Sequence, residues 1–398
     1  MDHLVEKFRR KVDRTRLDFV RGAMDVIPWQ SRMVAIRGAR GVGKTTLLLQ
    51  YIKRQLPEQL DRTLYVSLDD LWFAGHSLTG LADEFVKKGG LYLFLDEVHK
   101  LPRWSRAIKN IYDDHPDLKI VFTGSSLLET LDARADLSRR AVVYNMAGLS
   151  FREYLNMQAG TDFSALTLAE ILKKNETMSA SIVRRIKPLR YFPGYLRGGY
   201  YPYFLEDPDT YLIRLEETVN MILELELPLL RAVDMAYVPK LKRLMGVITE
   251  SAPFLPNISK LSERIGINRN TLINYLRHLQ DAGLINALYK KAPRISALQK
   301  PNKLYLENTN LMALLKSGTA NVGTMRETFL ANQLLNTHEV HYPHQGDFLV
   351  DGTITFEVGG KSKSSGQIKR IDQAYIAADD IEYGHGKTIP LWLLGFLY

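Results

Sequence analysis

Short apolar segments alternate with helix-like segments between Met33 and Leu149. The apolar segments read MVAIRG, TLYVSL, LYLFLDE, LKIVFTGS and RAVVYNMAGL. The stretches between them repeat apolar positions at helical spacing, and strands that alternate with helices form parallel sheets covered on both faces. This part of the chain therefore predicts an α/β domain.

The flanking sequence follows other patterns. Residues 3–24 repeat apolar positions at helical spacing with basic residues between them, which predicts a solvated amphipathic helix. Binding of nucleic acid by its basic face is the alternative. Residues 150–256 are mainly helical, residues 258–288 form a third unit, and the remainder returns to short strands and helices.

A glycine-rich loop joins the first apolar segment to a helical segment. It reads GARGVGKT over residues 38–45, a complete P-loop between a strand and a helix. Its glycines let backbone N–H groups surround phosphate, and the start of the helix adds positive charge. We expect Lys44 to contact the β- and γ-phosphates and Thr45 to hold Mg²⁺. The residues expected to contact nucleotide are Gly38, Ala39, Arg40, Gly41, Val42, Gly43, Lys44, Thr45, Thr46 and Asp96.

Two acids follow the buried segment LYLFLDE. Asp96 and Glu97 stand at its C-terminal end, where open α/β sheets bind ligands. We expect Asp96 to complete the Mg²⁺ shell through water. Glu97 is expected to orient and polarise the water that attacks the γ-phosphate.

The next strand ends in hydroxyl side chains, and arginines follow it. Thr123, Ser125 and Ser126 could each reach the γ-phosphate or its water, although hydroxyls at strand ends also cap helices. One of three arginines could act as an arginine finger, in cis or toward a neighbouring subunit, and Arg140 is favoured over Arg134 and Arg139. The chain has no Asn-Lys-x-Asp sequence for reading guanine, so we expect the nucleotide to be ATP.

Four stretches in order give the chain a family resemblance. RGARGVGKTTLLLQ, LYLFLDEVHK, VFTGSSLLE and RAVVYNMAGLSFREYL resemble the AAA-type ATPases of bacteria and archaea that carry a C-terminal domain of unknown function. The resemblance covers most of the chain. It implies a five-stranded core with the sensor strand between the two Walker strands, Ser125 as sensor and Arg140 at the arginine position. Arg139 stands where a glycine is expected.

A helix-turn-helix pattern occupies residues 258–285. Apolar positions on two helical segments flank Gly266, with a basic segment after them that predicts a wing carrying Lys290, Lys291 and Arg294. The outer face of the second helix presents side chains able to contact phosphates and base edges, namely Arg269, Asn270, Asn274, Arg277 and His278. DNA contact and internal packing as a clamp remain equal alternatives.

The C-terminal segment resembles the nuclease-like domain of the same family. The resemblance places Glu327 on a helix, Asp347 on one strand and Glu357 on the next. A two-residue loop at Asp351-Gly352 would put the last two acids on opposite faces of the sheet, whereas a three-residue loop ending in Gly352 would put them on one face.

The lysine that such a nuclease needs beside its second acid is absent. Gly359 occupies its position, and Lys361 could only reach back from further along the strand. We therefore expect the acids Glu327, Asp347 and Glu357 to be a vestigial site without nuclease activity.

These assignments predict an α/β fold of several parts. A P-loop NTPase parallel sheet is followed by a helical connector, a winged helix-turn-helix and a small C-terminal α/β nuclease-like domain. The predicted regions are 1–160 for the P-loop ATPase domain with its N-terminal helix, 161–255 for the helical lid or connector, 256–315 for the winged helix-turn-helix and 316–398 for the inactive restriction-nuclease-like domain.

Composition sets limits on the location and partners. The 398 residues carry a net charge of +9, which permits binding to polyanions, and the absence of cysteine suits a reducing compartment. No signal peptide or membrane span is expected, and the apolar terminus LWLLGFLY reads as a buried strand. We expect a cytoplasmic protein that forms no membrane contact and that could form a homo-oligomer.

The sequence leads to one principal hypothesis and two alternatives. The principal one is an ATP-binding and slowly ATP-hydrolysing AAA-type switch, dependent on Mg²⁺, whose nucleotide state rearranges the winged-helix and C-terminal domains around a partner such as DNA. The alternatives are an ATP-regulated, metal-dependent nuclease and a protein-binding scaffold with structural ATP.

Overall fold

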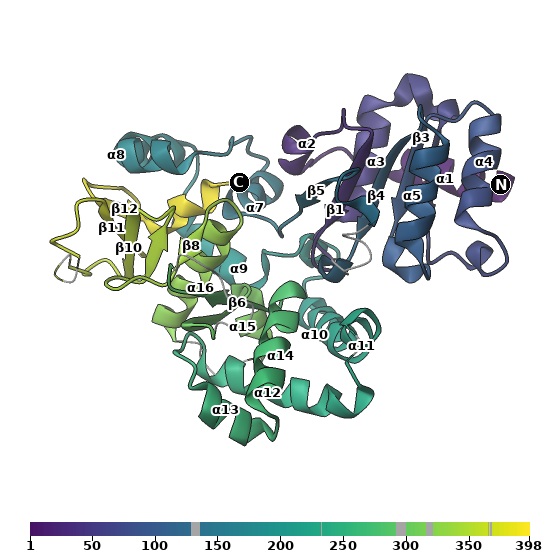
Figure 1. Cartoon of the computed structure of the whole chain (residues 1–398). Helices are drawn as coiled ribbons and strands as arrows, with labels where there is room; N and C mark the ends of the chain where they lie inside the picture. Colours follow the sequence, from purple (N-terminus) through teal and green to yellow (C-terminus); the bar gives the residue numbers. More distant parts are fainter. Residues whose placement is uncertain (129–135, 232, 292–299, 316–320, 365, 367) are drawn as a thin grey trace. The chain divides into compact units, whose positions relative to one another are not determined.

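The computed structural model describes residues 1–398 apart from 129–135, 232, 292–299, 316–320, 365 and 367 (Figure 1). Its residues form two compact units, Met1–Gly148 and Leu149–Tyr398. We call them the N-terminal unit and the C-terminal unit. Among the helices in these described ranges, none combines the length and hydropathy needed to cross a lipid bilayer.

A five-stranded parallel sheet forms the centre of the N-terminal unit (Figure 1). Its strands, in the order β2-β3-β4-β1-β5, are β1 (Met33–Arg37), β2 (Thr63–Ser67), β3 (Tyr92–Asp96), β4 (Lys119–Gly124) and β5 (Val142–Asn145). Each apolar segment of the predicted alternation therefore forms a strand, and the α/β fold class is confirmed. The sensor strand β4 lies between β1 and β3, as the family resemblance implied.

Helices cover this sheet. They are α1 (Asp2–Arg14), α2 (Ala23–Val26), α3 (Lys44–Gln55), α4 (Leu78–Lys87) and α5 (Trp104–Asp114). Helix α1 packs against α3 and β2, burying Leu4, Phe8 and Val12. It ends at Arg14, earlier than the predicted amphipathic segment, because the backbone turns to an extended conformation at Thr15.

The C-terminal unit combines helices with two small sheets. Its α-helices are α7 (Phe151–Ala159), α8 (Leu168–Arg185), α9 (Pro188–Gly198), α10 (Tyr211–Met221), α11 (Leu227–Arg231), α12 (Val238–Ser251), α13 (Ile258–Ile265), α14 (Arg269–Asp281), α15 (Thr309–Leu315) and α16 (Val322–Leu335). The predominantly helical stretch after Ser150 thus agrees with the sequence pattern.

The larger sheet of this unit is mixed. Its strands, in the order β12-β11-β10-β9-β8, are β8 (Val340–His341), β9 (Phe348–Val350), β10 (Ile354–Gly359), β11 (Ala374–Ala378) and β12 (Thr388–Pro390). The pairs β8–β9 and β9–β10 are antiparallel, whereas β10–β11 and β11–β12 are parallel. The apolar end of the chain forms a buried 3₁₀ helix, Leu391–Phe396, rather than the predicted strand. The preceding strand β12 ends at Pro390, and proline cannot donate to a ladder.

Two helices and a hairpin follow one another in residues 258–306. Gly266 ends α13 with a φ of 73°, a conformation that glycine adopts without a steric penalty, and α14 starts three residues later. Strands β6 (Ile285–Leu288) and β7 (Lys303–Leu306) then pair antiparallel. The assignment of this arrangement to a winged helix, like the division into four regions, stays a proposal.

Candidate functional site

The P-loop runs from the end of β1 to the start of α3. Gly41 and Gly43 have φ angles of 84° and 97°, which fold the loop back on itself and favour glycine. Gly38 has no room for a side chain, because a Cβ there would meet the carbonyl of Met146. The loop thus takes the tight path that its glycines predicted.

Lys44 bends back over this loop. Its Nζ donates to the carbonyl oxygens of Gly38 and Ala39 at 2.8 and 3.0 Å, and the residue is only 6% exposed. The positive charge is therefore held inside the curve of the loop, beside the start of α3. Both features suit an anion with several oxygen atoms.

Asp96 is the centre of a buried group of hydroxyls. Its Oδ2 accepts from Thr45 Oγ1 and from Tyr65 Oη, each at 2.7 Å, and its Oδ1 accepts from the hydroxyl of Thr123. Burial raises the pKa of Tyr65, with the charge of Asp96 acting in the same direction, so this phenol stays a donor. Tyr65 was not predicted from the sequence, where it reads as an apolar residue of β2.

The donors Thr45 and Asp96 fit a magnesium ion that a phosphate helps to hold. Mg²⁺ takes oxygen ligands and is usually bound by one or two carboxylates together with substrate phosphates. Within the described ranges, there is no group of three or more acidic or histidine side chains placed to hold a metal ion. The protein thus offers a hydroxyl and a carboxylate, which is a partial set of ligands.

Glu97 follows β3 in a left-handed conformation, with a φ of 54°. Its N–H donates to Thr123 Oγ1 at 3.1 Å, which ties this turn to the neighbouring strand β4. Burial raises the pKa of Glu97, and the positive charge of Lys44 opposes that change. A half-buried carboxylate of this kind can accept a proton from water more readily than an exposed one.

His99 connects Glu97 with Ser125. Its Nε2 lies 3.4 Å from Glu97 Oε2, and its Nδ1 accepts from the N–H of Ser125 at 3.4 Å. Because Nδ1 accepts, the neutral ring carries its proton on Nε2, facing the carboxylate. The Ser125 hydroxyl accepts from the N–H of Leu127, which fits the capping role that the sequence left open. His99 was not predicted as a site residue, although its position two residues after Glu97 could have suggested it.

The hydrogen-bond partners of Arg140 are two other aspartates, which do not belong to the group around Asp96. Its guanidinium pairs with both carboxylate oxygens of Asp113, at 3.0 and 2.9 Å, and donates to the carbonyl of Asp136 at 2.9 Å. Arg139 is exposed, and Arg134 lies outside the described residues. A finger role for Arg140 would require its pair with Asp113 to open.

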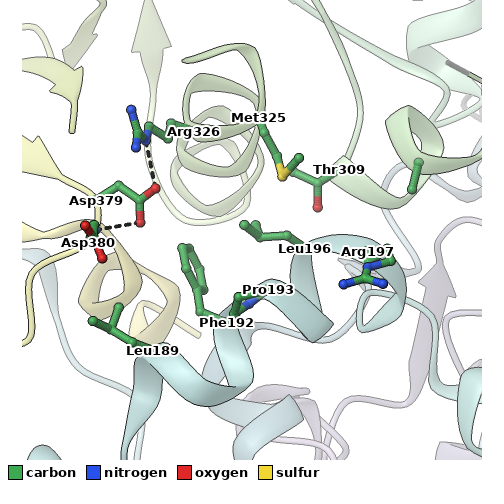
Figure 2. Close-up of a pocket in the computed structure, with 11 residues that line it drawn as sticks. Leu189, Phe192, Pro193, Leu196, Arg197, Thr309, Met325, Arg326, Asp379 and Asp380 are labelled. Atoms are coloured by element: carbon green, nitrogen blue, oxygen red, sulfur yellow. Dashed lines mark hydrogen bonds and ion pairs between the residues drawn. The ribbon is translucent and has the colours of Figure 1, made fainter. Parts of the chain in front are cut away.

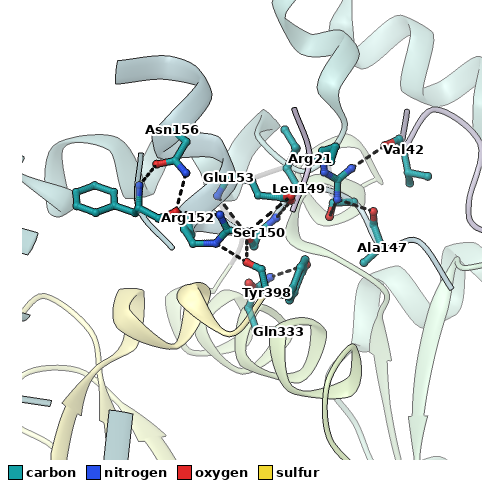
Figure 3. A network of polar contacts seen from close by, with 12 residues as sticks. Arg21, Val42, Ala147, Leu149, Ser150, Arg152, Glu153, Asn156, Gln333 and Tyr398 are labelled. Atoms are coloured by element: carbon teal, nitrogen blue, oxygen red, sulfur yellow. Dashed lines mark hydrogen bonds and ion pairs between the residues drawn. The ribbon is translucent and has the colours of Figure 1, made fainter. Parts of the chain in front are cut away.

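A buried arginine braces the back of the P-loop (Figure 3). Arg21 donates from Nη1 to the carbonyl of Val42 at 2.8 Å, and from Nη2 to those of Ala147 and Gly148 at 3.0 and 2.8 Å. It therefore holds the loop to the segment that follows β5. This role could not be predicted from the sequence, because Arg21 lies among several charged residues.

The predicted DNA-contacting residues share the outer face of α14. Arg269, Asn270 and Asn274 are exposed, and Arg277 is half-buried. Of the expected wing residues, Arg294 lies outside the described residues, and the ammonium of Lys291 fills the space beside Gly352 at the β9–β10 turn. The structure thus leaves the α14 face open and places Lys291 against the larger sheet.

The loop between β9 and β10 settles the register of the C-terminal acids. Val350 pairs with Ile354, so the loop has three residues, Asp351 to Thr353. The predicted three-residue loop ended one residue earlier, at Gly352. This register places Asp347 opposite Glu357, and both lie on one face. They nevertheless have different partners.

Lysines occupy the space between these acids. Lys303 Nζ lies 2.6 Å from Glu327 Oε2 and 3.8 Å from Asp347 Oδ1. Burial raises the pKa of Glu327, and the charge of Lys303 opposes that change. Lys363 Nζ lies 2.5 Å from Glu357 Oε1.

Lys363 takes the space left open by Gly359. A Cβ on Gly359 would meet the Cβ, Cγ and Cδ atoms of Lys363 at 2.5 to 2.7 Å. Lys361, the alternative weighed from the sequence, pairs with Asp380 instead. The lysine near Glu357 therefore comes from the loop after the strand, a position that strand spacing does not reveal.

A pocket of about 430 Å³ in the C-terminal unit was not predicted (Figure 2). Helix α9 lines it with Phe192, Pro193 and Leu196. On its polar side, Arg326 pairs with Asp379 at 2.7 Å. Its charged groups are thus partly neutralised by each other.

Comparisons with known proteins place two family models on the chain. An AAA domain matches residues 30–155, and a domain of unknown function (DUF8612) matches residues 190–321. Among curated proteins, none matches this chain.

Two solved structures show low overall similarity. PCH-2 from C. elegans is 16% identical with a TM-score of 0.25, over 44% of this chain and 46% of that one. AMPPCP-bound DnaA from Aquifex aeolicus is 15% identical with a TM-score of 0.28, over 65% of this chain and 85% of that one. The aligned part thus spans about half the length of PCH-2. The AAA domain match covers the whole set of P-loop, acid-pair and sensor residues, and the chain carries an AAA-type domain.

Proposed function

We propose that this protein is an ATP-binding and slowly ATP-hydrolysing AAA-type switch. The observation that carries the proposal is the hydrogen-bonded group of Thr45, Asp96 and Thr123 beside the P-loop lysine. Lys44 and the loop N–H groups bind the phosphates. Thr45 and Asp96 hold Mg²⁺, which neutralises phosphate charge when bound.

Glu97 orients and polarises the attacking water. The raised pKa of its half-buried carboxyl supports this role, since a base whose pKa is nearer the working pH transfers protons more efficiently. His99 lies beside this carboxylate on one side and contacts the sensor residue Ser125 on the other. Ser125 reports the state of the γ-phosphate through this contact.

Single-turnover hydrolysis of labelled ATP with Mg²⁺ tests the proposal. The expected result is slow release of phosphate by the wild type and none by Thr45→Ala, whose hydroxyl no longer holds the ion. ATP that binds tightly and is never hydrolysed would favour a scaffold with structural ATP instead.

The partner belongs to the same proposal. The nucleotide state rearranges the helix-turn-helix and C-terminal regions around a partner, and DNA is the candidate that the exposed α14 face supports. Arg269→Ala with Arg277→Ala should weaken DNA binding and reduce its salt dependence. Unchanged binding by this double variant would assign α14 to internal packing.

A further inference from the structure

Helix α1 carries a stripe of basic side chains next to the candidate nucleotide site. Lys7, Arg10, Lys11 and Arg14 follow the spacing that places residues on one helical face, while Leu4, Phe8 and Val12 are buried. From the sequence, these basic residues were expected to form a solvated face, with nucleic-acid binding as the alternative.

The basic stripe forms one side of a pocket of about 480 Å³ within the N-terminal unit. The other side is formed by the ends of β2 and β3 and the start of α3, including Thr45, Asp96 and Glu97. One wall thus carries hydroxyl and carboxylate oxygens, and the facing wall carries cations. A metal ion bound to a phosphate matches both walls, because the ion suits the carboxylate side and the phosphate oxygens suit the basic side.

Most of the cations on the stripe already have contacts. Lys7 Nζ lies 2.6 Å from Asp70 Oδ2, and Arg10 lies 3.2 Å from Glu6. Lys11 Nζ stands 4.9 Å from the centre of the Tyr65 ring, whose hydroxyl donates to Asp96. Arg14 is exposed, and its guanidinium makes no hydrogen bond or ion pair with any residue in the described part of the chain.

The end of α1 is held against the helix that starts at the P-loop. Lys53 of α3 donates to the carbonyls of Asp13 and Thr15 at 2.9 and 2.8 Å. Gln50 donates to those of Arg16 and Phe19 at 2.9 and 2.8 Å. The end of α1 that carries Arg14 is therefore held against α3, the helix that presents Lys44 and Thr45.

We infer that Arg14 binds oxygen atoms of the γ-phosphate of ATP from within the same chain, with Lys11 adding positive charge beside it. The inference rests on the proposed function. It gives the N-terminal helix the part for which Arg140 was favoured from the sequence, and the guanidinium of Arg140 is paired with Asp113. Because ADP lacks the γ-phosphate, Arg14 should distinguish ATP from ADP.

Titrations of Mg²⁺ with ATP or ADP into the full chain test the inference. Arg14→Ala should weaken ATP binding by about 10-fold, as expected when a hydrogen bond between charged groups is lost. ADP binding should change by less than about twofold, and Arg14→Lys should recover part of the ATP affinity. Arg9→Ala is the matched control, because Arg9 is on the same helix but pairs with Asp61 outside the pocket.

The outcomes separate the two proposals. If the wild type binds neither nucleotide, the proposed function fails together with its extension. If the wild type binds ATP and Arg14→Ala binds it equally well, or loses ATP and ADP to the same extent, the role of Arg14 is wrong and the proposed function stands. Circular dichroism of each variant verifies that the helix has formed.

Discussion

The imidazole of His99 stands 3.4 Å from the carboxylate of Glu97, and on its other side it accepts from the N–H of Ser125. A single side chain thus joins the proposed catalytic acid to the proposed sensor. This arrangement links the segments that directly follow the neighbouring strands β3 and β4. In the proposed function, His99 is a positioning residue, because it would act through Glu97.

Substitutions of His99 should separate its two contacts. Glutamine places its terminal amide near the Nε2 position, whereas asparagine places its amide near Nδ1. We expect His99→Asn to slow single-turnover hydrolysis by about 10-fold with little change in ATP affinity, and His99→Gln to retain more activity. Lys100→Ala, at the exposed neighbouring position, is the control. Equal rates in both His99 variants and wild type would remove His99 from the mechanism.

Glu97→Gln should bind ATP and hydrolyse it at least ~100-fold more slowly, because the amide keeps the shape and loses the charge that polarises water. The wild-type rate should fall as the pH drops through the pKa of Glu97, which burial raises above its ordinary value of 4.5. The rate falls at low pH because only the deprotonated carboxylate polarises the attacking water. Rates measured as the pH is lowered from neutral should show this loss in wild type and a flat profile in the variant. Unchanged turnover in Glu97→Gln would move the role to another residue.

A buried acid in the C-terminal unit should make its stability depend on pH. Glu307 accepts hydrogen bonds from Tyr200, Asn308 and Asn332. Burial raises its pKa from 4.5 to about 7. A carboxyl whose pKa is higher in the folded state stabilises the fold at pH values below its unfolded pKa, and this stabilisation is lost as the pH rises through the folded pKa.

Urea unfolding at pH 5 and pH 8 tests this relationship. Glu307 should contribute roughly 3 kcal/mol to the difference between the two conditions, with the greater free energy of unfolding at pH 5. Glu307→Gln should remove that contribution, whereas Glu339→Gln at an exposed position should preserve it. The same pH dependence in Glu307→Gln and wild type would show that this carboxyl does not titrate there.

The chain should not cleave nucleic acid. The ammonium of Lys303 lies beside the carboxylates of Glu327 and Asp347, so the charge that a divalent cation would neutralise is already balanced by a side chain. Incubation of supercoiled plasmid and single-stranded RNA with Mg²⁺ or Mn²⁺, with and without ATP, should leave both intact. Cleavage that the wild type performs and Glu357→Ala loses would make the nuclease hypothesis the leading one.

Removing the Lys303 ammonium should reveal the charge it balances. Lys303→Met leaves two neighbouring carboxylates without their cation, and we expect Mn²⁺ to raise the melting temperature of this variant but not of wild type. Lys303→Arg keeps the charge and should behave as wild type. Equal responses to Mn²⁺ in all three proteins would show that Lys303 does not stand in for a cation.

Local sequence rules predicted the arrangement of the P-loop and the acid pair because its determinants are local. The P-loop is contiguous, and the acid pair directly follows a buried strand, so the spacing alone brings Lys44, Thr45, Asp96 and Glu97 to one edge of the sheet. The strand order followed from the family resemblance, since the alternation of strands and helices is compatible with several orders.

Contacts between distant segments could not be predicted in this way. Tyr65 reads as an apolar strand residue, and only the pairing of β2 with β3 brings its hydroxyl to Asp96. Arg21 lies near the end of the predicted amphipathic segment, whose periodicity does not reveal that the side chain reaches the P-loop. The register of Asp347 and Glu357 depended on a turn that two loop lengths fit equally, and Lys363 reaches Glu357 from beyond the strand.

The most direct measurement of the central claim is nucleotide binding by the wild type and by Lys44→Ala. Lys44 reaches the loop carbonyls from α3, and its charge is the one expected to meet the β- and γ-phosphates. Arg54→Ala, an exposed position on the same helix, removes equal charge away from the loop. Titration with a fluorescent ATP analogue and Mg²⁺ should give saturable binding in wild type and Arg54→Ala and none in Lys44→Ala. Equal affinity in all three proteins would contradict the assignment of the phosphate site and with it the proposed function.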